Sequence, residues 1–397
     1  MSNLGRRVIS VVLPFAALPL AASTPAIAVA QETTATRGEV PVLGRKPFVD
    51  YFMPTPIIKP LSRDVWGAAT VGPRDTGNGL EDATMKRWNY WDGQILKGPD
   101  GRYRMLASRW DQATGHEAWV NSLAVEAVSD SLYGPYTDRG LIWPTDQGGK
   151  GHNVTALRLP DGRYAVMISE TRNGDIYTSG SIDGPWRKLG DIVVDQSAFK
   201  SVFTPAELQK DAVMKPWHGS NLSIMARPGG GFEIIQRSGQ ILVSPTDILG
   251  PYKVMGDSIY RGLAGLPQTG MDAYEDPVIW HSGGWYHVVV NHWRDRRAFH
   301  LISRDGVTAW KVQGLAYEPG AKFIRYTNGV VNHWNKLERP GVVIANGHVI
   351  AISFAVIDVP KEQQKGDDGH GSKIVVVPFD GAAMDRDLKD VDKAGAR

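Results

Sequence analysis

Residues 271–300, with the sequence MDAYEDPVIWHSGGWYHVVVNHWRDRRAFH, contain the pattern that decides the fold. Two runs rich in β-branched and aromatic residues flank Gly283-Gly284, and such runs around a glycine turn predict two antiparallel strands. In a hairpin, the start of the first strand and the end of the second lie at the same edge, so we expect Asp276 beside the Asn291-His292 pair. A carboxyl group and an imidazole at one buried strand edge indicate a functional site.

The same hairpin pattern recurs five times along the chain, at a spacing of roughly 55–68 residues. Each copy has an apolar run, a turn with glycine, a second apolar run and a further turn such as GPY or GPW. A repeat of about four strands is typical of β-propeller blades, whereas no 3.6-residue periodicity supports a helical repeat. We therefore predict an all-β fold, a five-bladed β-propeller, with blades at approximately 88–145, 150–195, 215–260, 272–316 and 330–384.

The composition fits one large β domain. The 397 residues include 44 Gly and 25 Pro, which suit many turns, and no flexible linker separates the repeats. We expect the propeller at 88–384, preceded by a leader and ring-closing segment at 31–87 and followed by a charged, fraying tail at 385–397. The absence of Cys excludes disulfides and thiolate chemistry.

The first 30 residues have the features of a signal peptide. Arg6 and Arg7 precede an apolar run at 8–22, which is short for a membrane span, and Ala28 and Ala30 form a small-x-small cleavage motif. An uncleaved membrane anchor is the alternative interpretation. We expect a secreted or periplasmic protein without membrane association after signal removal.

The charge balance argues against nucleic acid as a partner. The chain has 44 basic and 42 acidic residues, and removal of 1–30 takes away Arg6 and Arg7 but no acid, which leaves 42 of each. A balanced chain offers no basic field for phosphate groups.

Aligning the repeats on their turn glycine places one polar residue at the start of each innermost strand. The offset is nine residues in four repeats and eight in the repeat at 271–300, whose turn looks one residue shorter. The five aligned residues are Asp92, Asn153, Asn221, Asp276 and Glu338. Because innermost strands line the axis of a propeller, we expect these side chains to meet in one funnel. Clustered carboxylic acids raise one another's pKa, as acid/base catalysis requires, although Asp and Asn also cap turns routinely.

Basic side chains are expected on the same rim, where the second strands end. The candidates for substrate binding, beside Asn153 and Asn221, are Arg109, His116, His152, Arg172, His218, Arg237, His292 and Arg294. We interpret the arginines as ligands of an anionic group, such as a uronate carboxylate or a sulfate. Solvated surface residues are the alternative. Neighbouring tryptophans offer a platform on which a sugar ring can stack.

These motifs resemble the five-bladed propeller glycoside hydrolases of families 43 and 117. The resemblance rests on WDG at 91–93, EDP at 275–277, LERP at 337–340 and the repeated DGRY and GPY or GPW elements, and it covers roughly 88–384. Family 43 acts on arabinosides, xylosides and galactosides, and family 117 on anhydro-galactosides of agar. The family 43 likeness implies that Asp92 is a general base. The order Asp, Asp, Glu with a preceding His is similar to family 117 and implies Asp92, Asp276, Glu338 and His333 as catalytic residues.

We expect inverting hydrolysis of a terminal glycosidic bond in a plant or algal oligosaccharide or polysaccharide. A propeller funnel is a pocket, which suits exo attack on chain ends. Asp92 would activate water, Glu338 or His333 would protonate the leaving oxygen, and Asp276 would orient the sugar or tune the acid. Two alternatives are a polysaccharide lyase on the same scaffold and a non-catalytic carbohydrate-binding propeller. The latter predicts acids that are far apart or paired with Arg. We expect no cofactor and no metal, since no tight ligand spacing appears, although His370 is a candidate metal ligand.

Overall fold

Twenty β-strands in five sheets dominate the residues described by the computed structural model, which are 39–62, 66–172, 174–195, 197, 219–320 and 323–395. The first sheet contains β1 (Trp88–Lys97), β2 (Tyr103–Asp111), β3 (Leu123–Ser129) and β4 (Thr137–Leu141). The second contains β5 (Val154–Arg158), β6 (Tyr164–Ile168), β7 (Asp175–Ser179) and β8 (Arg187–Asp191). The third contains β10 (Ser223–Ala226), β11 (Phe232–Ile235), β12 (Ile241–Ser244), β13 (Tyr252–Val254) and, parallel to β13, β9 (Val194–Asp195).

The last two sheets complete the set. The fourth contains β14 (Tyr274–Ser282), β15 (Trp285–His292), β16 (Arg297–Ser303) and β17 (Lys311–Tyr317). The fifth contains β18 (Lys336–Ala345), β19 (His348–Ile357) and β20 (Ser372–Pro378). Short 3₁₀ helices in the connections are η1 (Phe48–Tyr51), η2 (Ala69–Val71), η3 (Gln112–Thr114), η4 (His116–Asn121), η5 (Gln147–Gly149), η8 (Met271–Ala273) and η9 (Lys361–Gln363).

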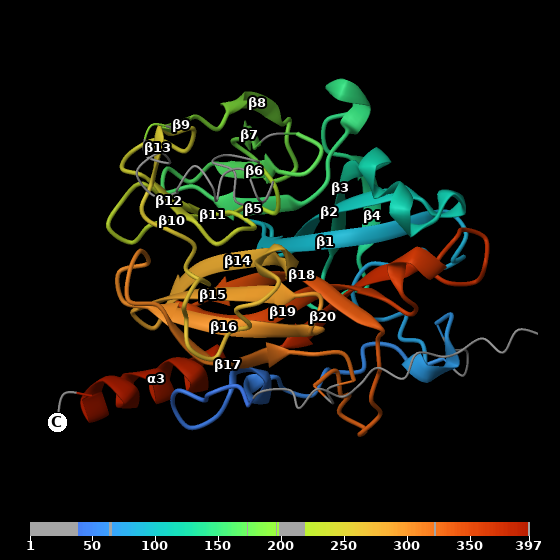
Figure 1. Cartoon of the computed structure of the whole chain (residues 1–397). Helices are drawn as coiled ribbons and strands as arrows, with labels where there is room; N and C mark the ends of the chain where they lie inside the picture. The colour runs from blue at the N-terminus through green and yellow to red at the C-terminus, as the bar shows by residue number, and fades with distance from the viewer. Residues whose placement is uncertain are drawn as a thin grey trace, which may run out of the picture. The chain divides into compact units, whose positions relative to one another are not determined.

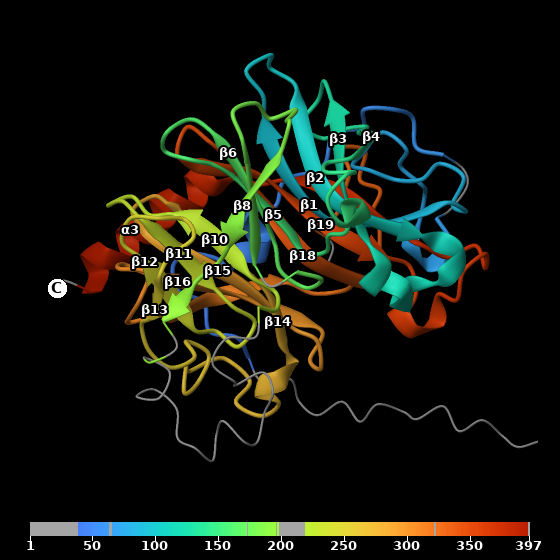
Figure 2. The same ribbon diagram turned by 90° about the horizontal axis from the view of Figure 1, so that it is seen from above.

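The innermost strands close a ring. Each of them contacts its two neighbours in the order β1, β5, β10, β14, β18 and back to β1, and the sheets fan out from this centre (Figures 1 and 2). The predicted all-β fold and five-bladed β-propeller are therefore confirmed.

Apolar layers between neighbouring sheets hold the ring together. Strand β15 shows how one strand serves two layers, because Val289 packs in the cluster shared with the fifth sheet and Val288 and Val290 pack in the cluster shared with the third. This alternation follows from the two-residue period of a strand, which points successive side chains to opposite faces. Buried aliphatic side chains are each worth about 1.5–3 kcal/mol, so these layers supply most of the stabilisation.

The leader completes the last sheet, which has only three strands of its own. Leu80 forms an antiparallel bridge with Ile374 of β20, and Phe52 forms one with Phe379. The amide side chain of Asn78 also bonds to the backbone of Val376 in both directions. The segment therefore covers an edge that would otherwise expose unpaired backbone groups.

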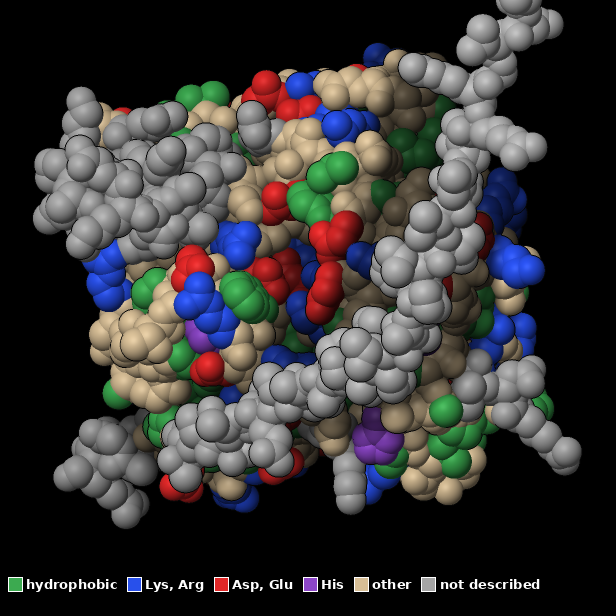
Figure 3. Space-filling model, turned by 45° about the vertical axis from the view of Figure 1, so that its right-hand side comes forward, with side chains coloured by type: hydrophobic (Ala, Val, Ile, Leu, Met, Phe, Trp, Pro, Cys, Tyr) green, Lys and Arg blue, Asp and Glu red, His purple; other side chains and the backbone are tan. Residues whose placement is uncertain are grey.

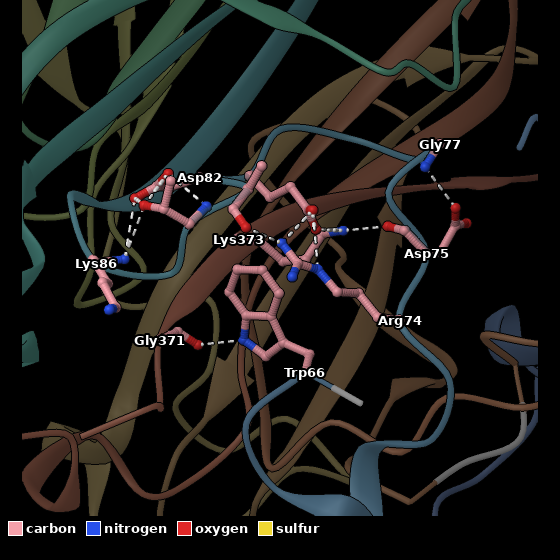
Figure 4. Close-up of polar contacts among 11 residues, drawn as sticks. Trp66, Arg74, Asp75, Gly77, Asp82, Lys86, Gly371 and Lys373 are labelled. Atoms are coloured by element: carbon pink, nitrogen blue, oxygen red, sulfur yellow. Dashed lines mark hydrogen bonds and ion pairs between the residues drawn. The ribbon is translucent and has the colours of Figure 1, made fainter. Parts of the chain in front are cut away.

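A buried lysine locks this segment onto β20 (Figure 4). Nζ of Lys373 donates to Oε2 of Glu81 and to the carbonyl of Asp75, each at 2.7 Å, and Arg74 donates to Oε1 of Glu81 at 2.8 Å. The guanidinium of Arg74 also lies 5.0 Å from the ring centroid of Trp66. We call Arg74, Glu81 and Lys373 the leader clasp.

The charged C-terminal segment is a helix rather than the fraying tail that we expected. Helix α3 (Gly381–Gly395) lies against β19 and η1 at the outside of the ring (Figure 1). Met384 and Leu388, spaced four apart on one face, are buried in the apolar layer, and Asp385 accepts a hydrogen bond from Ser282 at 3.1 Å. Among the described residues, no helix has the length and apolar character that crossing a membrane requires.

Candidate active site

One residue at the start of each innermost strand has a left-handed backbone conformation, and these five residues form a ring on the axis. They are Asp92 (φ 69°), Asn153 (φ 55°), Asn221 (φ 44°), Asp276 (φ 53°) and Arg339 (φ 48°). Asp and Asn tolerate this conformation better than other non-glycine residues. In β1, β14 and β18 the position coincides with a shift in strand register, which is the kind of irregularity that redirects side chains at functional rims.

The structure corrects the alignment in the last blade. Glu338 does lie nine residues before Gly347, but the pairing of Ala345 with His348 shows a two-residue turn, as in the fourth blade. The first three blades have five-residue turns, for which an offset of nine is right. The shorter turn makes eight the correct offset, so Arg339 is the fifth member of the ring and Glu338 precedes it.

A polar cavity of about 260 Å³ opens at this end of the ring. It is lined by Trp91, His116, Glu117, Trp119, His152, Asn153, Glu170, Asn221, Arg237, Glu275, Asp276, Glu338 and Lys361. The predicted residues His116, His152, Asn153, Asn221, Arg237, Asp276 and Glu338 therefore meet here, although they come from all five blades.

Asp92 lies beneath the cavity and does not line it. Its side chain is 1% exposed, and Oδ1 accepts a hydrogen bond from Nε of Arg339 at 3.1 Å. Oδ2 accepts from the hydroxyl of Ser108 and from the backbone N–H of Val154. Both oxygens are thus engaged, whereas the family resemblance implies that Asp92 activates a water molecule.

Three carboxyl groups from the last two blades form the acidic side of the cavity. Glu275, Asp276 and Glu338 each present one oxygen within 4.8 Å of the other two. Burial, with the charges of Glu338 and Asp276, raises the pKa of Glu275 to about 8. Burial likewise raises the pKa of Asp276 to about 6, against the opposing charge of Arg339. Glu275 is thus largely protonated at neutral pH.

Glu338 has the opposite electrostatic environment. Nζ of Lys336 donates to Oε1 at 2.8 Å, and Nζ of Lys361 contacts Oε2. Burial acts to raise the pKa of Glu338, but the two ammonium groups outweigh it and hold the pKa below its ordinary range. The two ammonium groups thus favour the ionised form of Glu338, whereas the general-acid role expected of Glu338 requires the protonated form.

Aromatic and imidazole side chains from the first blade and the start of the second line another part of the cavity. The rings of Trp119 and His152 lie 4.9 Å apart, and those of Trp91 and His116 lie 4.8 Å apart. Burial lowers the pKa of His152 to about 4 and that of His116 well below its usual value, so both imidazoles are neutral at pH 7. The half-buried Trp119 offers a flat apolar face to a bound ring.

The second and third blades supply a carboxylate and an amide. Oε1 of Glu170 accepts from the hydroxyl of Ser220 and from the backbone N–H of Asn221 at 2.9 Å. Oδ1 of Asn221 is buried and has no hydrogen-bond partner within the part of the chain that the structure describes. An unpaired buried acceptor is costly, so this oxygen is suited to receive a ligand hydroxyl.

Several predicted ligands do not line the cavity, because they are paired elsewhere. Arg109 pairs with Asp138, Arg172 with Asp146 and Asp175, and Arg294 with Asp272. These three rim arginines are thus neutralised within the protein, and Figure 3 shows a similar mixing of basic and acidic side chains over one face. His292 is buried beside Asp295, and His333 is exposed. His218 lies outside the described residues.

Besides the two tryptophans, four residues of the cavity were not among the predicted ligands: Glu117, Glu170, Glu275 and Lys361. Glu275 was recognisable as an acid beside Asp276, but the turn alignment favoured its neighbour. Glu170 follows the end of β6, and Lys361 begins η9 in a charged loop. No sequence pattern shows that the Lys361 side chain returns to the axis, where its Nζ lies 4.9 Å from the ring centroid of Trp91.

The carboxyl cluster has the spacing of a metal site, but its surroundings are cationic. Lys336 and Lys361 already neutralise Glu338, and Arg339 lies 3.5 Å from Asp276. A divalent cation would have to displace or approach these charges. His370, the other candidate ligand, pairs with Asp358 and does not line the cavity.

Neither a protein-family model nor a curated protein sequence matches the chain. Among solved structures, the chain is similar to a family 117 glycoside hydrolase from the marine bacterium Zobellia galactanivorans, with a TM-score of 0.48, 12% identity, and coverage of 77% of this chain and 88% of that one. A family 43 β-1,3-galactosidase gives a TM-score of 0.48 and 15% identity over 80% and 94% of the two chains. A third protein, described as a glycoside hydrolase, gives 0.50 and 15% over 76% and 61%. The chain is thus similar in fold, at low sequence identity, to this third protein, which is described as a glycoside hydrolase.

Proposed function

We propose that the protein is a glycoside hydrolase that cleaves a terminal glycosidic bond in the axial cavity. The observation that carries the proposal is the clustering of Glu275, Asp276 and Glu338 on one cavity, where burial and the neighbouring charges raise the pKa of Glu275. Glycosidases use a pair of carboxyl groups, in which one protonates the leaving oxygen and another acts on water or on the sugar.

Glu275 is the proposed general acid. It lines the cavity, accepts a hydrogen bond from Asn291 at 3.2 Å and keeps its proton at neutral pH. A catalytic acid works best when its pKa lies near the working pH, because it is then both protonated and able to give up the proton. Glu338 and Asp276 serve this group electrostatically, since their charges oppose its ionisation.

Glu170 is the proposed general base. In a ring of five blades, the second blade faces the gap between the fourth and fifth, so Glu170 lies across the cavity from Glu275. This arrangement suits inversion, in which acid and base stand about 6.5–9.5 Å apart with water between them. The family resemblance implies Asp92 in this role, but Asp92 has both oxygens engaged beneath the cavity floor.

The cavity suits one terminal sugar that carries a negative charge. Its volume is below the roughly 300–1,000 Å³ of pockets for drug-sized ligands, which favours a chain end over an internal segment. Two ammonium groups converge on the single carboxylate of Glu338, so Lys361 retains donors for an anionic substituent, and Arg237 lies on the same cavity. Trp119 provides the stacking face, and Oδ1 of Asn221 accepts a hydroxyl.

The substrate is proposed to be a plant or algal oligosaccharide or polysaccharide that the protein meets outside the cytoplasm. This part of the proposal rests on the signal-like residues 1–30, which lie outside the described residues. Export would bring the cavity to polymers that cannot enter a cell.

The carbohydrate-binding alternative has one observation in its favour, because Asp92 and Asp276 are both paired with Arg339, as that alternative predicts. Glu275 distinguishes a binding module from a hydrolase. A binding module has no use for a protonated carboxyl held between ionised ones, whereas a glycosidase requires it.

A product screen in heavy-oxygen water tests the proposal. The purified protein is incubated with acidic and neutral oligosaccharides, and the products are read by mass. Hydrolysis predicts one ¹⁸O atom at each new reducing end. Elimination adds no water, so an unsaturated product lighter than its hydrolytic counterpart by one water, with no ¹⁸O in either fragment, would instead establish a lyase. Binding without turnover would establish the binding module.

A further inference from the structure

Arg339 is the exception in the axial ring. The other four members are Asp or Asn, which adopt left-handed backbone conformations readily, whereas an arginine at φ 48° is uncommon. Residues kept in sparsely populated conformations persist where the surrounding structure fixes them, and they cluster at functional sites. The position is therefore held by something other than local preference.

The contacts of Arg339 explain what holds it. Its Nε donates to Asp92 of the first blade at 3.1 Å, and its Nη1 lies 3.5 Å from Asp276 of the fourth blade. The side chain is nearly fully buried, at 4% exposure, so solvent does not screen these pairs. One guanidinium thus joins three blades directly below the cavity, and it touches Asp276 but does not line the cavity itself.

We propose that Arg339 is a positioning residue of the hydrolytic site: it keeps Asp276 ionised, and the ionised Asp276 in turn keeps the proton on Glu275. The inference rests on the proposed function, since Glu275 is the general acid there. Arg339 does not touch the substrate. It determines which carboxyl group of the cluster carries the proton.

The charges around the cluster come from several elements. Glu338 and Lys336 face it from β18, Lys361 from η9, Asp92 from β1 and Arg237 from the connection after β11. Tyr317 of β17 also lies within electrostatic reach, and burial keeps its phenol neutral by raising its pKa. Arg339 acts directly on Asp276, whereas the charges that act most on Glu275 are those of Glu338 and Asp276.

The relay through Asp276 predicts an unusual direction for the change in the pKa of Glu275 when Arg339 is replaced. Removing a positive charge normally raises the pKa of nearby acids, because the ionised form loses a favourable partner. If Arg339 acts through Asp276, its loss makes Asp276 neutral, and Glu275 then loses a repelling neighbour. The pKa of Glu275 therefore falls. The direct effect and the relayed effect have opposite signs, so one titration distinguishes them.

The test compares pH profiles of kcat/KM for the wild type, R339M and R339K on one oligosaccharide. The wild-type profile should fall on the basic side near pH 8, where Glu275 ionises. R339M should move this limb down by about one pH unit, and R339K, which keeps a charge on a shorter side chain, should move it less in the same direction. A limb that stays in place or moves up in both variants overturns the proposal, even if activity falls at every pH.

Two further variants keep the test decisive if R339M does not fold. D276N imitates the neutral Asp276 and should lower the same limb, with Arg339 intact. D92N removes a like charge near Asp276 and leaves Arg339 to pair with Asp276 alone. The basic limb of its pH profile should therefore not move to lower pH. A downward shift in D92N equal to that in D276N would contradict the relay.

A measurement without turnover separates this inference from the proposed function. The ¹³C resonance of the Glu275 side-chain carboxyl, assigned by its loss in E275Q, is titrated in the wild type and in R339K. A lower midpoint in R339K supports the relay even if no substrate is cleaved. An unchanged midpoint overturns it even if the protein proves to be a hydrolase.

Discussion

Lys361 contacts Glu338 although the whole of β19 separates the two residues in sequence. Its Nζ touches Oε2 of Glu338, while Lys336 holds Oε1 at 2.8 Å from the same strand as the acid. The two lysines are therefore alike towards Glu338 and differ in one respect, because Lys361 lines the cavity and Lys336 does not. This difference allows the binding role of Lys361 to be measured separately.

Substitution of Lys361 should lower the activity on anionic substrates selectively. K361Q removes a charge-assisted hydrogen bond to the substrate, worth about 1.5–3 kcal/mol, so kcat/KM on an acidic oligosaccharide should fall about 10- to 150-fold. The neutral analogue should lose much less. K336Q is the matched control, since it also removes one ammonium from Glu338. Equal losses in both variants on both substrates would show that Lys361 acts only through Glu338.

Exchange of the proposed base should be distinguishable from exchange of Asp92. E170A removes the carboxylate that activates water, so kcat should fall about 10²- to 10⁴-fold, and added azide should restore part of the turnover by replacing water as the nucleophile. D92A should retain more activity and gain nothing from azide, because Asp92 does not line the cavity. If azide restores D92A and not E170A, the base is Asp92, as the family resemblance implies.

The ion pairs of the leader clasp should contribute more to the unfolding free energy than ion pairs at the surface. E81Q leaves Lys373 buried with a weakened partner, and breaking a buried pair costs about 3–5 kcal/mol of unfolding free energy. K373M should cost less, because Glu81 keeps Arg74. D161N, which breaks the half-exposed Arg163–Asp161 pair, is the control and should cost less than about 1 kcal/mol. Urea denaturation measures the unfolding free energy of all three variants. Similar losses in E81Q and D161N would show that the leader clasp stabilises the fold no more than a surface ion pair.

Glu233 should make stability depend on pH outside the cavity. It is fully buried in β11, and burial raises its pKa to about 8, although Arg227 lies 3.3 Å away. Since the folded pKa exceeds the unfolded value, the contribution of this group is complete below about pH 4.5 and is lost as pH rises through 8. Relative to E233Q, the wild type should therefore lose about 2–4 kcal/mol between pH 5 and 8. Parallel stability curves would show that Glu233 is ionised throughout.

The repeat was readable because each blade carries the same local signals. A glycine turn between two β-branched runs, five times at similar spacing, leaves few folds besides a five-bladed propeller, and that prediction is confirmed. The helix at 381–395 was missed because its buried positions, Met384 and Leu388, are few among charged residues. The sequence shows the charge, and only the neighbouring strand shows what those two side chains pack against.

The residues of the cavity could be predicted from the sequence only in part. Strand order brought the right blade positions together, but counting back from Gly347 put Glu338 where Arg339 lies, because a two-residue turn looks like a longer one in sequence. The rim arginines were misjudged for another reason. Arg109 and Asp138 are paired through strands that are distant in sequence, and no local pattern reports such a partner. The contact of Lys361 with Glu338 likewise joins residues that are far apart in the sequence, so no local pattern predicts it.

The most direct test of the central claim compares Glu275 with a second buried glutamate of similarly raised pKa. E275Q should lower kcat about 10²- to 10⁴-fold on an oligosaccharide, whose leaving oxygen needs a proton, and should spare a nitrophenyl glycoside, whose leaving group does not. Glu233 has the same raised pKa but lies off the cavity, so E233Q should cleave both substrates at the wild-type rate. The account predicts this split between substrates in E275Q alone. Full activity of E275Q on the oligosaccharide, or equal losses on both substrates, would contradict it.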